Sequence, residues 1–207
     1  MKMMTRLALF LLILVGASSC ATMDKSECLQ ADWRMIGMED GSAGRQLSYI
    51  GTRRKDCAEH GVTPNLEQYN IGRNEGLKQF CTYQNGYRHG SNGNSNTDVC
   101  QGGLQGAYVD GYNKGSEVYG MTKEINQMTS QLRSKESELA GLDEDIRVAE
   151  SKLISRAGSQ AARISQLDHY NHLKADRDSL ANYLYNLDQD IAKKRQQRDA
   201  LDAQYSR

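Results

Sequence analysis

Apolar residues recur at alternating steps of four and three in the C-terminal part of this chain, and this spacing limits the fold more than any other feature. The series consists of Met121, Ile125, Met128, Leu132, Leu139, Leu142, Ile146, Ala149 and Leu153. Lys135 occupies one position of the series. A heptad repeat of this length predicts a coiled-coil helix.

A second and more polar series follows. It consists of Tyr170, Leu173, Leu180, Leu184, Leu187, Ile191, Leu201 and Tyr205, with Arg177, Lys194 and Arg198 at intervening positions. Residues 156–160 lack the pattern, and Gly158 can end one helix before another begins. We therefore expect residues 121–207 to form an antiparallel helical hairpin with its turn near 156–160. The same apolar stripe would also serve a parallel coiled coil between copies of the protein, so a homo-oligomer through residues 121–207 is the alternative.

Two apolar residues near the expected turn do not fit the second series. Ile164 and Leu167 are out of phase with the register that follows them. This predicts a slip of register or a local re-pairing near the hairpin tip. The tip, around residues 155–167, is also where a hairpin of this kind could contact another molecule.

The region before residue 120 has a different composition. It holds sixteen of the nineteen glycines of the chain, seven of its eleven tyrosines, and its single proline and tryptophan. The glycines follow aromatic residues and lie four apart in four pairs: Gly37 and Gly41, Gly72 and Gly76, Gly86 and Gly90, and Gly111 and Gly115. Glycines four apart share one face of a helix, where another backbone can approach closely. We expect short, tightly packed helices.

A ligand groove is the functional alternative for the same pattern. Its floor would be glycine backbone, and its walls would be aromatic rings of the kind that stack on sugars or peptides. The candidate residues are Trp33, Tyr69, Tyr83, Tyr87, Tyr108 and Tyr112.

The first twenty residues have the features of an export signal. Lys2 and Arg6 precede an apolar run over residues 7–15, which is far shorter than the roughly twenty residues that a membrane-spanning helix needs. Small residues then lead into Cys20, which resembles the lipobox of bacterial lipoproteins, although Ala17 stands where that pattern usually has leucine. The resemblance implies cleavage after residue 19, a lipid anchor on Cys20, and a further acyl chain such as palmitate on the new N-terminus. Residues 20–27 would be a lipidated tether.

The remaining four cysteines, Cys28, Cys57, Cys81 and Cys100, form an even set in a protein expected to enter an oxidising compartment. Four cysteines allow three pairings. We favour Cys28 with Cys57 and Cys81 with Cys100, because shorter loops close more readily. The expected organisation is a mainly α protein, with a disulfide-stapled domain over residues 28–120 and the hairpin over 121–207.

These residues carry a resemblance to a known family. Cys28 with Asp32-Trp33, Tyr69-x-x-Gly72-Arg73 with Gly76-Leu77, Asn85-Gly86-Tyr87-x-x-Gly90 and Tyr108-x-x-Gly111, within the frame of four cysteines, are similar to proteobacterial envelope lipoproteins known only as a domain of unknown function. The similar stretch covers about residues 24–120. The resemblance implies an envelope lipoprotein and supplies no catalytic residue.

Charge and motifs exclude several functions. Removal of Lys2 and Arg6 leaves 24 basic against 26 acidic side chains, a balance that does not suggest nucleic-acid binding. Cys57 and His60 have the spacing of half a zinc site, but an oxidising compartment disfavours a free thiolate. We therefore expect no metal and no cofactor.

We expect a non-catalytic binding or scaffold protein, lipid-anchored in the outer membrane and facing the periplasm, with a protein or peptidoglycan partner. Ala21, rather than aspartate, after the lipidated cysteine favours the outer membrane. The alternative is an enzyme that acts on peptidoglycan or another envelope polymer through the aromatic groove. Its candidate acids and bases are Asp32, Asp40, His60 and His89.

Overall fold

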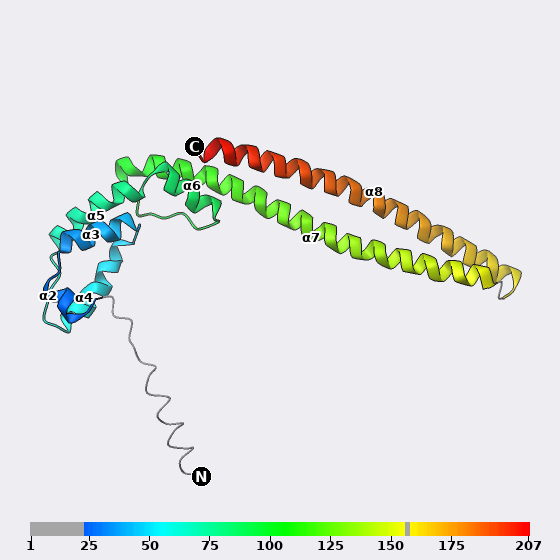
Figure 1. Cartoon of the computed structure of the whole chain (residues 1–207), viewed down its shortest axis with the longest axis horizontal. Helices are drawn as coiled ribbons and strands as arrows, with labels where there is room; N and C mark the ends of the chain where they lie inside the picture. The colour runs from blue at the N-terminus through cyan, green and yellow to red at the C-terminus, as the bar shows by residue number, and fades with distance from the viewer. Residues whose placement is uncertain (1–22, 156–157) are drawn as a thin grey trace, which may run out of the picture. The chain divides into compact units, whose positions relative to one another are not determined.

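The computed structural model describes residues 23–155 and 158–207, and all of its elements are helical (Figure 1). In sequence order they are α2 (Lys25–Leu29), α3 (Trp33–Ser42), η1 (Leu47–Tyr49), α4 (Ile50–Ala58), α5 (Leu66–Phe80), α6 (Tyr83–Ser91), η2 (Gly102–Leu104), α7 (Gln105–Ser155) and α8 (Gln160–Tyr205). The expected fold class, a disulfide-stapled helical region followed by a long antiparallel hairpin, is confirmed. The export signal and Cys20 lie outside the described residues.

The protein divides into two compact units. The first unit comprises the described residues up to Thr82 together with Thr97–Gln105, and the second comprises Tyr83–Asn96 and Gly106–Arg207. This differs from the expected division at residue 120, which falls inside the continuous helix α7. The physical reason is that one glycine costs a helix only about 1 kcal/mol, and the good helix formers Met121, Lys123 and Glu124 follow Gly120.

In the first unit, α3 and α5 run parallel and touch through their backbones. The side chain of Asp32 caps α3 by accepting hydrogen bonds from the backbone N–H groups of Arg34 and Met35, and Asn65 caps α5 in the same manner. A Cβ placed on Gly41 would lie 2.2 Å from the carbonyl oxygen of Arg73. The two helix faces are therefore as close as glycine permits. Parallel helices need a return segment, and η1 and α4 provide it.

The disulfide Cys28–Cys57 joins the segments that precede these two parallel helices. Its sulfur atoms lie in a core with Met23, Trp33 and Tyr69. The second disulfide joins Cys81 and Cys100. Both pairs are the ones that the shorter loops favoured, so this prediction is confirmed.

The second unit contains the same kind of helix pair, made by α6 and the beginning of α7. Gly86 and Gly90 take the places of Gly37 and Gly41, and a Cβ on Gly86 would lie 2.0 Å from the carbonyl oxygen of Tyr108. Gly111 and Gly115 correspond likewise to Gly72 and Gly76 and meet the backbones of Tyr83 and Tyr87. The loops correspond too, because left-handed Gly44 packs on the ring of Phe80 and left-handed Gly93 packs on the ring of Tyr119. The protein thus contains two copies of one glycine-paired helix unit.

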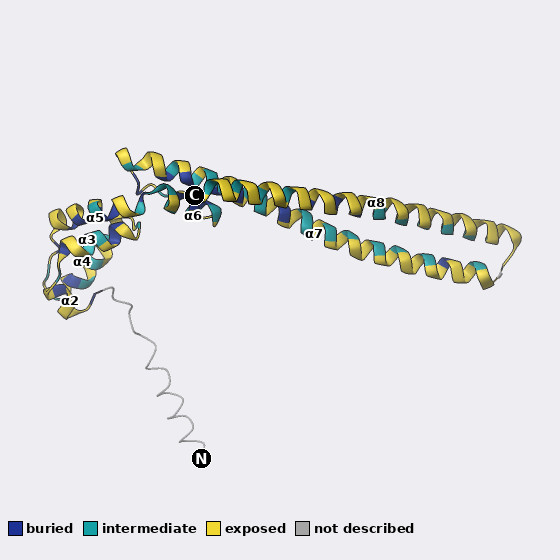
Figure 2. Ribbon diagram, turned by 45° about the horizontal axis from the view of Figure 1, so that its top comes forward, coloured by how far each residue is buried: buried dark blue, intermediate teal, exposed yellow. Residues whose placement is uncertain are grey.

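Beyond this pair, α7 and α8 form an antiparallel hairpin. Arg177 pairs with Asp143 at 3.1 Å, and the amide of Gln131 donates to the hydroxyl of Tyr183 at 2.7 Å, closer to the base. Ile125, Leu187 and Ile191 form a buried cluster still nearer the base, supported by Met128 and Leu132. Figure 2 shows the buried and half-buried positions along the facing sides of the two helices. These positions are those of the two apolar series.

The C-terminal end of α8 packs against α6. The hydroxyl of Tyr83 donates to the carbonyl oxygen of Tyr205 at 2.9 Å, and the hydroxyl of Tyr87 donates to the carboxylate of Asp202. The helix pair and the base of the hairpin therefore form one packed body within the second unit. The expected hairpin is thus present in the single polypeptide, and a homo-oligomer through residues 121–207 stays a prediction.

Within residues 23–155 and 158–207, none of the helices combines the length and the hydrophobicity that a membrane span requires.

Candidate functional site

The six aromatic residues of the predicted groove are mostly core residues. Tyr69 and Tyr108 are fully buried, and Trp33 and Tyr87 are buried as well. Tyr83 and Tyr112 are half-buried. Each buried ring fills space beside a glycine-paired helix contact, and burial leaves no ring face free for stacking on a ligand. The groove stays a prediction, and the burial of these rings argues against it.

A buried ion pair organises the first unit around Asp40. The carboxylate of Asp40 is 1% exposed and accepts hydrogen bonds from Nη2 of Arg53 at 2.7 Å, from Nε of Arg53 at 3.0 Å, and from the hydroxyl of Tyr69 at 3.0 Å. Arg45 adds a longer ion pair at 3.5 Å. Burial raises the pKa of Tyr69, and the hydrogen bond to Asp40 raises it further. The sequence pattern did not single out Arg53, because one arginine in the basic run Arg53-Arg54-Lys55 of a polar helix carries no signal of its partner.

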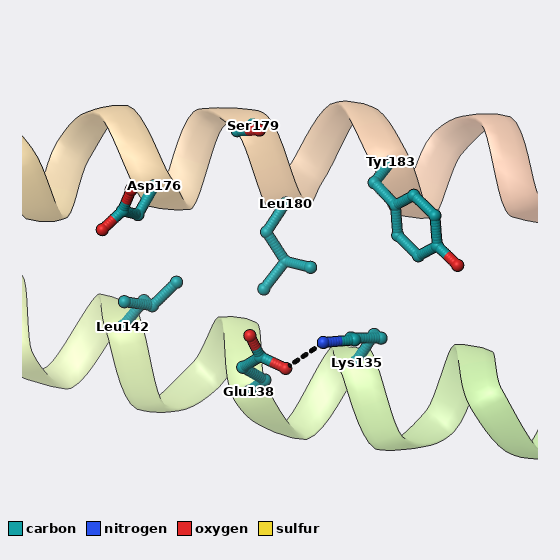
Figure 3. A pocket seen from close by; sticks show the side chains of 7 residues that line it. All are labelled: Lys135, Glu138, Leu142, Asp176, Ser179, Leu180 and Tyr183. Carbon is teal, nitrogen blue, oxygen red and sulfur yellow. Dashed lines mark hydrogen bonds and ion pairs between the residues drawn. The ribbon is translucent and has the colours of Figure 1, made fainter.

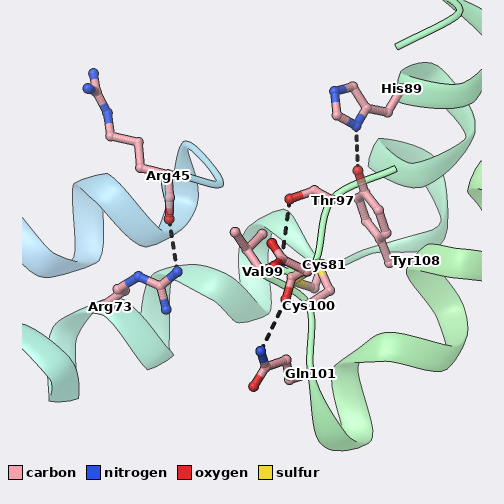
Figure 4. Close-up of a disulfide and its surroundings, with 10 residues drawn as sticks. Arg45, Arg73, Cys81, His89, Thr97, Val99, Cys100, Gln101 and Tyr108 are labelled. Carbon is pink, nitrogen blue, oxygen red and sulfur yellow. Dashed lines mark hydrogen bonds between the residues drawn. A yellow bond between two sulfur atoms is a disulfide. The ribbon is translucent and has the colours of Figure 1, made fainter. Parts of the chain in front are cut away.

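His89 occupies the place of Asp40 in the second helix pair. Its Nδ1 lies 2.6 Å from the hydroxyl of Tyr108, the counterpart of Tyr69 (Figure 4). The two rings also meet edge to face, with centroids 6.3 Å apart. Each helix pair thus uses one polar side chain to satisfy the hydroxyl of its buried tyrosine, which is a structural requirement for burying that group.

The other candidate acids and bases have structural positions. Asp32 caps α3, and His60 lies at the turn after α4 with its backbone N–H bonded to the carbonyl oxygen of Cys57. Because Cys57 is in a disulfide, it cannot serve as a thiolate ligand for zinc. None of these groups is arranged beside a nucleophile in the described part of the protein.

The far end of the hairpin exposes large apolar side chains. Ile154 is 73% exposed, Ile164 is 62% exposed and Leu167 is 50% exposed. We call these three the tip residues. Ala162 and Gln166 take the inward positions of α8 there, eight and four residues before Tyr170, and Ile164 and Leu167 are left on the outside. Two successive steps of four depart from the alternating spacing, which agrees with the predicted slip of register, and the slip does not bring Ile164 and Leu167 inward.

A hollow of about 500 Å³ lies along the middle of the hairpin (Figure 3). Lys135 interrupts the apolar series there and pairs with Glu138 at 2.6 Å. Leu142 lies beside Glu138 on α7, and Leu180 points from α8 towards α7. A charged residue in the seam leaves space that a leucine would fill, so the hollow is a packing feature of the coiled coil.

Residues 32–119 match the family model described as "Protein of unknown function (DUF2799)". This match covers both copies of the glycine-paired helix unit and ends before most of the hairpin. It confirms the resemblance at the level of a domain of unknown function. The search of curated proteins and the search of solved structures each found no match.

Proposed function

We propose that this protein is a non-catalytic scaffold of the bacterial cell envelope, lipid-anchored at Cys20 in the outer membrane and facing the periplasm. In this proposal the hairpin presents the tip residues to an envelope protein. The observation that carries the proposal is the exposure of Ile154, Ile164 and Leu167 at the end of a hairpin that buries residues of the same kind, Ile125, Leu187 and Ile191, nearer its base.

Burial of the exposed apolar tip residues would give a partner a favourable free energy of binding. An isoleucine or leucine that becomes fully buried gains about 1.5–3 kcal/mol, so a partner that covers the tip residues gains several such increments. Ile164 and Leu167 are at least half exposed, because the inward positions of α8 belong to other residues. Single exposed apolar residues are common on proteins, but three large ones around one turn are typical of an interaction surface.

The chemistry of the cysteines supports the proposed location outside the cytosol. Two disulfides persist in oxidising compartments and are rare in the cytosol. An export signal that ends in a lipobox-like sequence accounts for the fifth cysteine, Cys20. Several acyl chains on one cysteine would hold the protein firmly, because each buried CH₂ contributes about 0.8 kcal/mol.

Crosslinking in living cells tests the tip. A photoreactive residue at position 164 should capture a specific envelope protein, and the same residue at exposed Gln189 on the same helix should not. With the photoreactive residue kept at position 164, replacement of Ile154 and Leu167 by serine should abolish the capture with an unchanged melting temperature, whereas serine at Tyr185, which is 67% exposed, should preserve it. Equal capture from positions 164 and 189 would contradict the proposal.

The anchor has its own test. Cys20→Ser should move the protein from the membrane fraction to the soluble periplasmic fraction, because the thiol that would carry the diacylglycerol is removed. A variant that still sediments with outer membranes after a high-salt wash would refute the lipid anchor. Retention that the salt wash removes would show attachment through a protein instead, and it would refute the anchor equally.

The enzyme alternative gains no support from the geometry. Asp40 is neutralised by Arg53, and the carboxylate of Asp32 accepts two backbone hydrogen bonds. The buried rings of Tyr69 and Tyr108 cannot stack on a sugar. We therefore favour a binding role over peptidoglycan chemistry.

A further inference from the structure

A cavity of about 310 Å³ in the first unit is built differently from the hollow in the hairpin. Its wall includes residues from α5 and from the segment that the disulfide Cys81–Cys100 holds in place. The polar lining residues are Gln46, Arg73, Asn74, Lys78, Asp98 and Gln101. Leu47, Leu77, Val99 and Leu104 supply the apolar part of the wall.

Arg73 is the buried charge of this cavity. The residue is only 8% exposed, and its Nη2 donates to the carbonyl oxygen of Arg45 at 2.8 Å (Figure 4). Its Nε is buried without a hydrogen-bond partner. Among the described residues, no carboxylate forms a salt bridge with Arg73. A buried guanidinium with a neutral carbonyl as its partner lacks the counter-charge that normally accompanies burial.

The nearest buried carboxylate is already engaged. Asp40 accepts two hydrogen bonds from Arg53 and one from Tyr69, and it lies 3.5 Å from Arg45. Asp98, which also lines the cavity, is exposed and accepts a hydrogen bond from the amide of Gln46 at 2.6 Å. With Arg73 and Lys78 against Asp98, the lining has an excess of one positive charge.

The second helix pair shows that the loop carbonyl bonded by Arg73 does not require a charged partner. Tyr112 takes its place there, and the hydroxyl of Tyr112 donates to the carbonyl oxygen of Asn94 at 3.1 Å, the counterpart of Arg45. A neutral hydroxyl therefore satisfies the loop carbonyl in one copy of the unit. The positive charge of Arg73 and its additional donors are not required for that contact.

We propose that Arg73 anchors a binding site for the carboxylate group of a small ligand in this cavity. A carboxylate fits the planar, forked donors of arginine and supplies the missing counter-charge. Lys78 adds a second positive charge, and the amides of Gln46, Asn74 and Gln101 can bond to the rest of the ligand. This site lies in the first unit and does not depend on the proposed role of the hairpin tip.

The test is an NMR titration of the purified protein, processed by the cell and carrying ¹⁵N-labelled arginine residues. The Nε–H signal of Arg73, identified by its loss in Arg73→Tyr, should shift saturably with acetate or with the peptide acetyl-Ala-Ala. Tighter binding of the peptide assigns the site to the terminal carboxylate of a peptide, and tighter binding of acetate assigns it to a free small carboxylate. The peptide amide acetyl-Ala-Ala-NH₂ should cause no saturable shift.

Two variants separate binding from structure. Arg73→Tyr restores the residue of the second copy, so it should keep the loop contact and the melting temperature but weaken carboxylate binding about tenfold or more. Arg34→Gln removes an exposed arginine that pairs with Glu75 and should leave binding unchanged. The proposal is overturned if neither carboxylate shifts the Arg73 signal saturably, or if the peptide amide shifts it equally. The wild-type titration decides this even if a variant fails to fold.

Discussion

The carbonyl oxygen of Tyr69 lies 2.0 Å from the point where a Cβ on Gly37 would stand. Gly86 has the same relationship to Tyr108 in the second helix pair, at 2.0 Å. Side chains cannot occupy that space, so each pair of parallel helices approaches through glycine faces, where weak Cα–H···O contacts become available. The same tyrosines that offer these carbonyls bury their rings completely. Close backbone contact and aromatic burial are thus two parts of one packing arrangement.

Substitution of the contact glycines should be severely destabilising. Gly37→Ala or Gly86→Ala places a methyl group against backbone that cannot move without separating the helices. We expect a loss of about 3 kcal/mol, at the upper end of typical overpacking costs. Urea unfolding followed by circular dichroism measures it.

Other helical glycines supply the matched controls. Gly51 in α4 and Gly141 in α7 have nothing within 4 Å of a Cβ. Alanine there should stabilise the protein by about 0.5–1 kcal/mol, because alanine is the better helix former. A loss at Gly51 or Gly141 as large as at Gly37 would show that the backbone contact does not explain the loss at Gly37.

Buried Tyr69 should make stability fall at alkaline pH. Burial raises its pKa above the ordinary value of 10.0, so the folded state favours the neutral phenol. That contribution is fully present below pH 10 and is lost as the pH rises towards the raised pKa of the folded state. Tyr69→Phe should therefore flatten the decline of unfolding free energy above pH 10, while it costs about 1–3 kcal/mol at pH 7 through the hydrogen bond to Asp40.

Tyr185→Phe is the control for this pH dependence, because that ring is 67% exposed. The decline of unfolding free energy with rising pH should flatten only partly in Tyr69→Phe, since burial also raises the pKa of Tyr87 and of Tyr108. If unfolding free energy falls above pH 10 as steeply in Tyr69→Phe as in the wild type, ionisation of Tyr69 does not cause the alkaline loss of stability. Denaturant titrations at several pH values between neutrality and the alkaline limit provide the measurement.

The sequence predicts periodic features of this protein well. The heptad series locates the hairpin seam, including the interruption at Lys135, because coiled-coil packing depends on local spacing alone. Glycines four apart predict tight helix contacts for the same reason. The composition changes at residue 120, where the family match also ends, but the helix continues through Gly120 and the compact units divide elsewhere.

Contacts between distant residues are less visible in the sequence. The pairing of Asp40 with Arg53 and the burial of Arg73 depend on how the return segment crosses the helix pair, and no local pattern encodes that path. The aromatic groove illustrates the same difficulty. A tyrosine before a glycine pair suits either a ligand wall or a buried ring, and only the packing of α3 on α5 decides that Tyr69 is buried.

Replacement of Lys135 by leucine should stabilise the hairpin. The residue lies in the seam beside the hollow, and within the described part of the chain its salt bridge is to Glu138 on the same helix. Leucine should fill part of the hollow and gain about 1 kcal/mol, seen as a higher melting temperature. Lys193→Leu, on the exposed side of α8, should change stability by less than about 0.5 kcal/mol. If both variants melt alike, the hollow is not a packing defect.

Removal of either disulfide should destabilise the first unit more than the hairpin. Cys28 and Cys57 are 29 residues apart, and Cys81 and Cys100 are 19 apart, so each crosslink contributes about 3–4 kcal/mol in the loop-entropy model. The double variants Cys28→Ala/Cys57→Ala and Cys81→Ala/Cys100→Ala should exchange amide hydrogens faster in α3 and α5, while Ile125, Leu187 and Ile191 stay protected. The buried cluster of those three residues needs neither crosslink. Protection lost equally in both units would show that they unfold together. This result would contradict the prediction that the disulfides stabilise the first unit more than the hairpin.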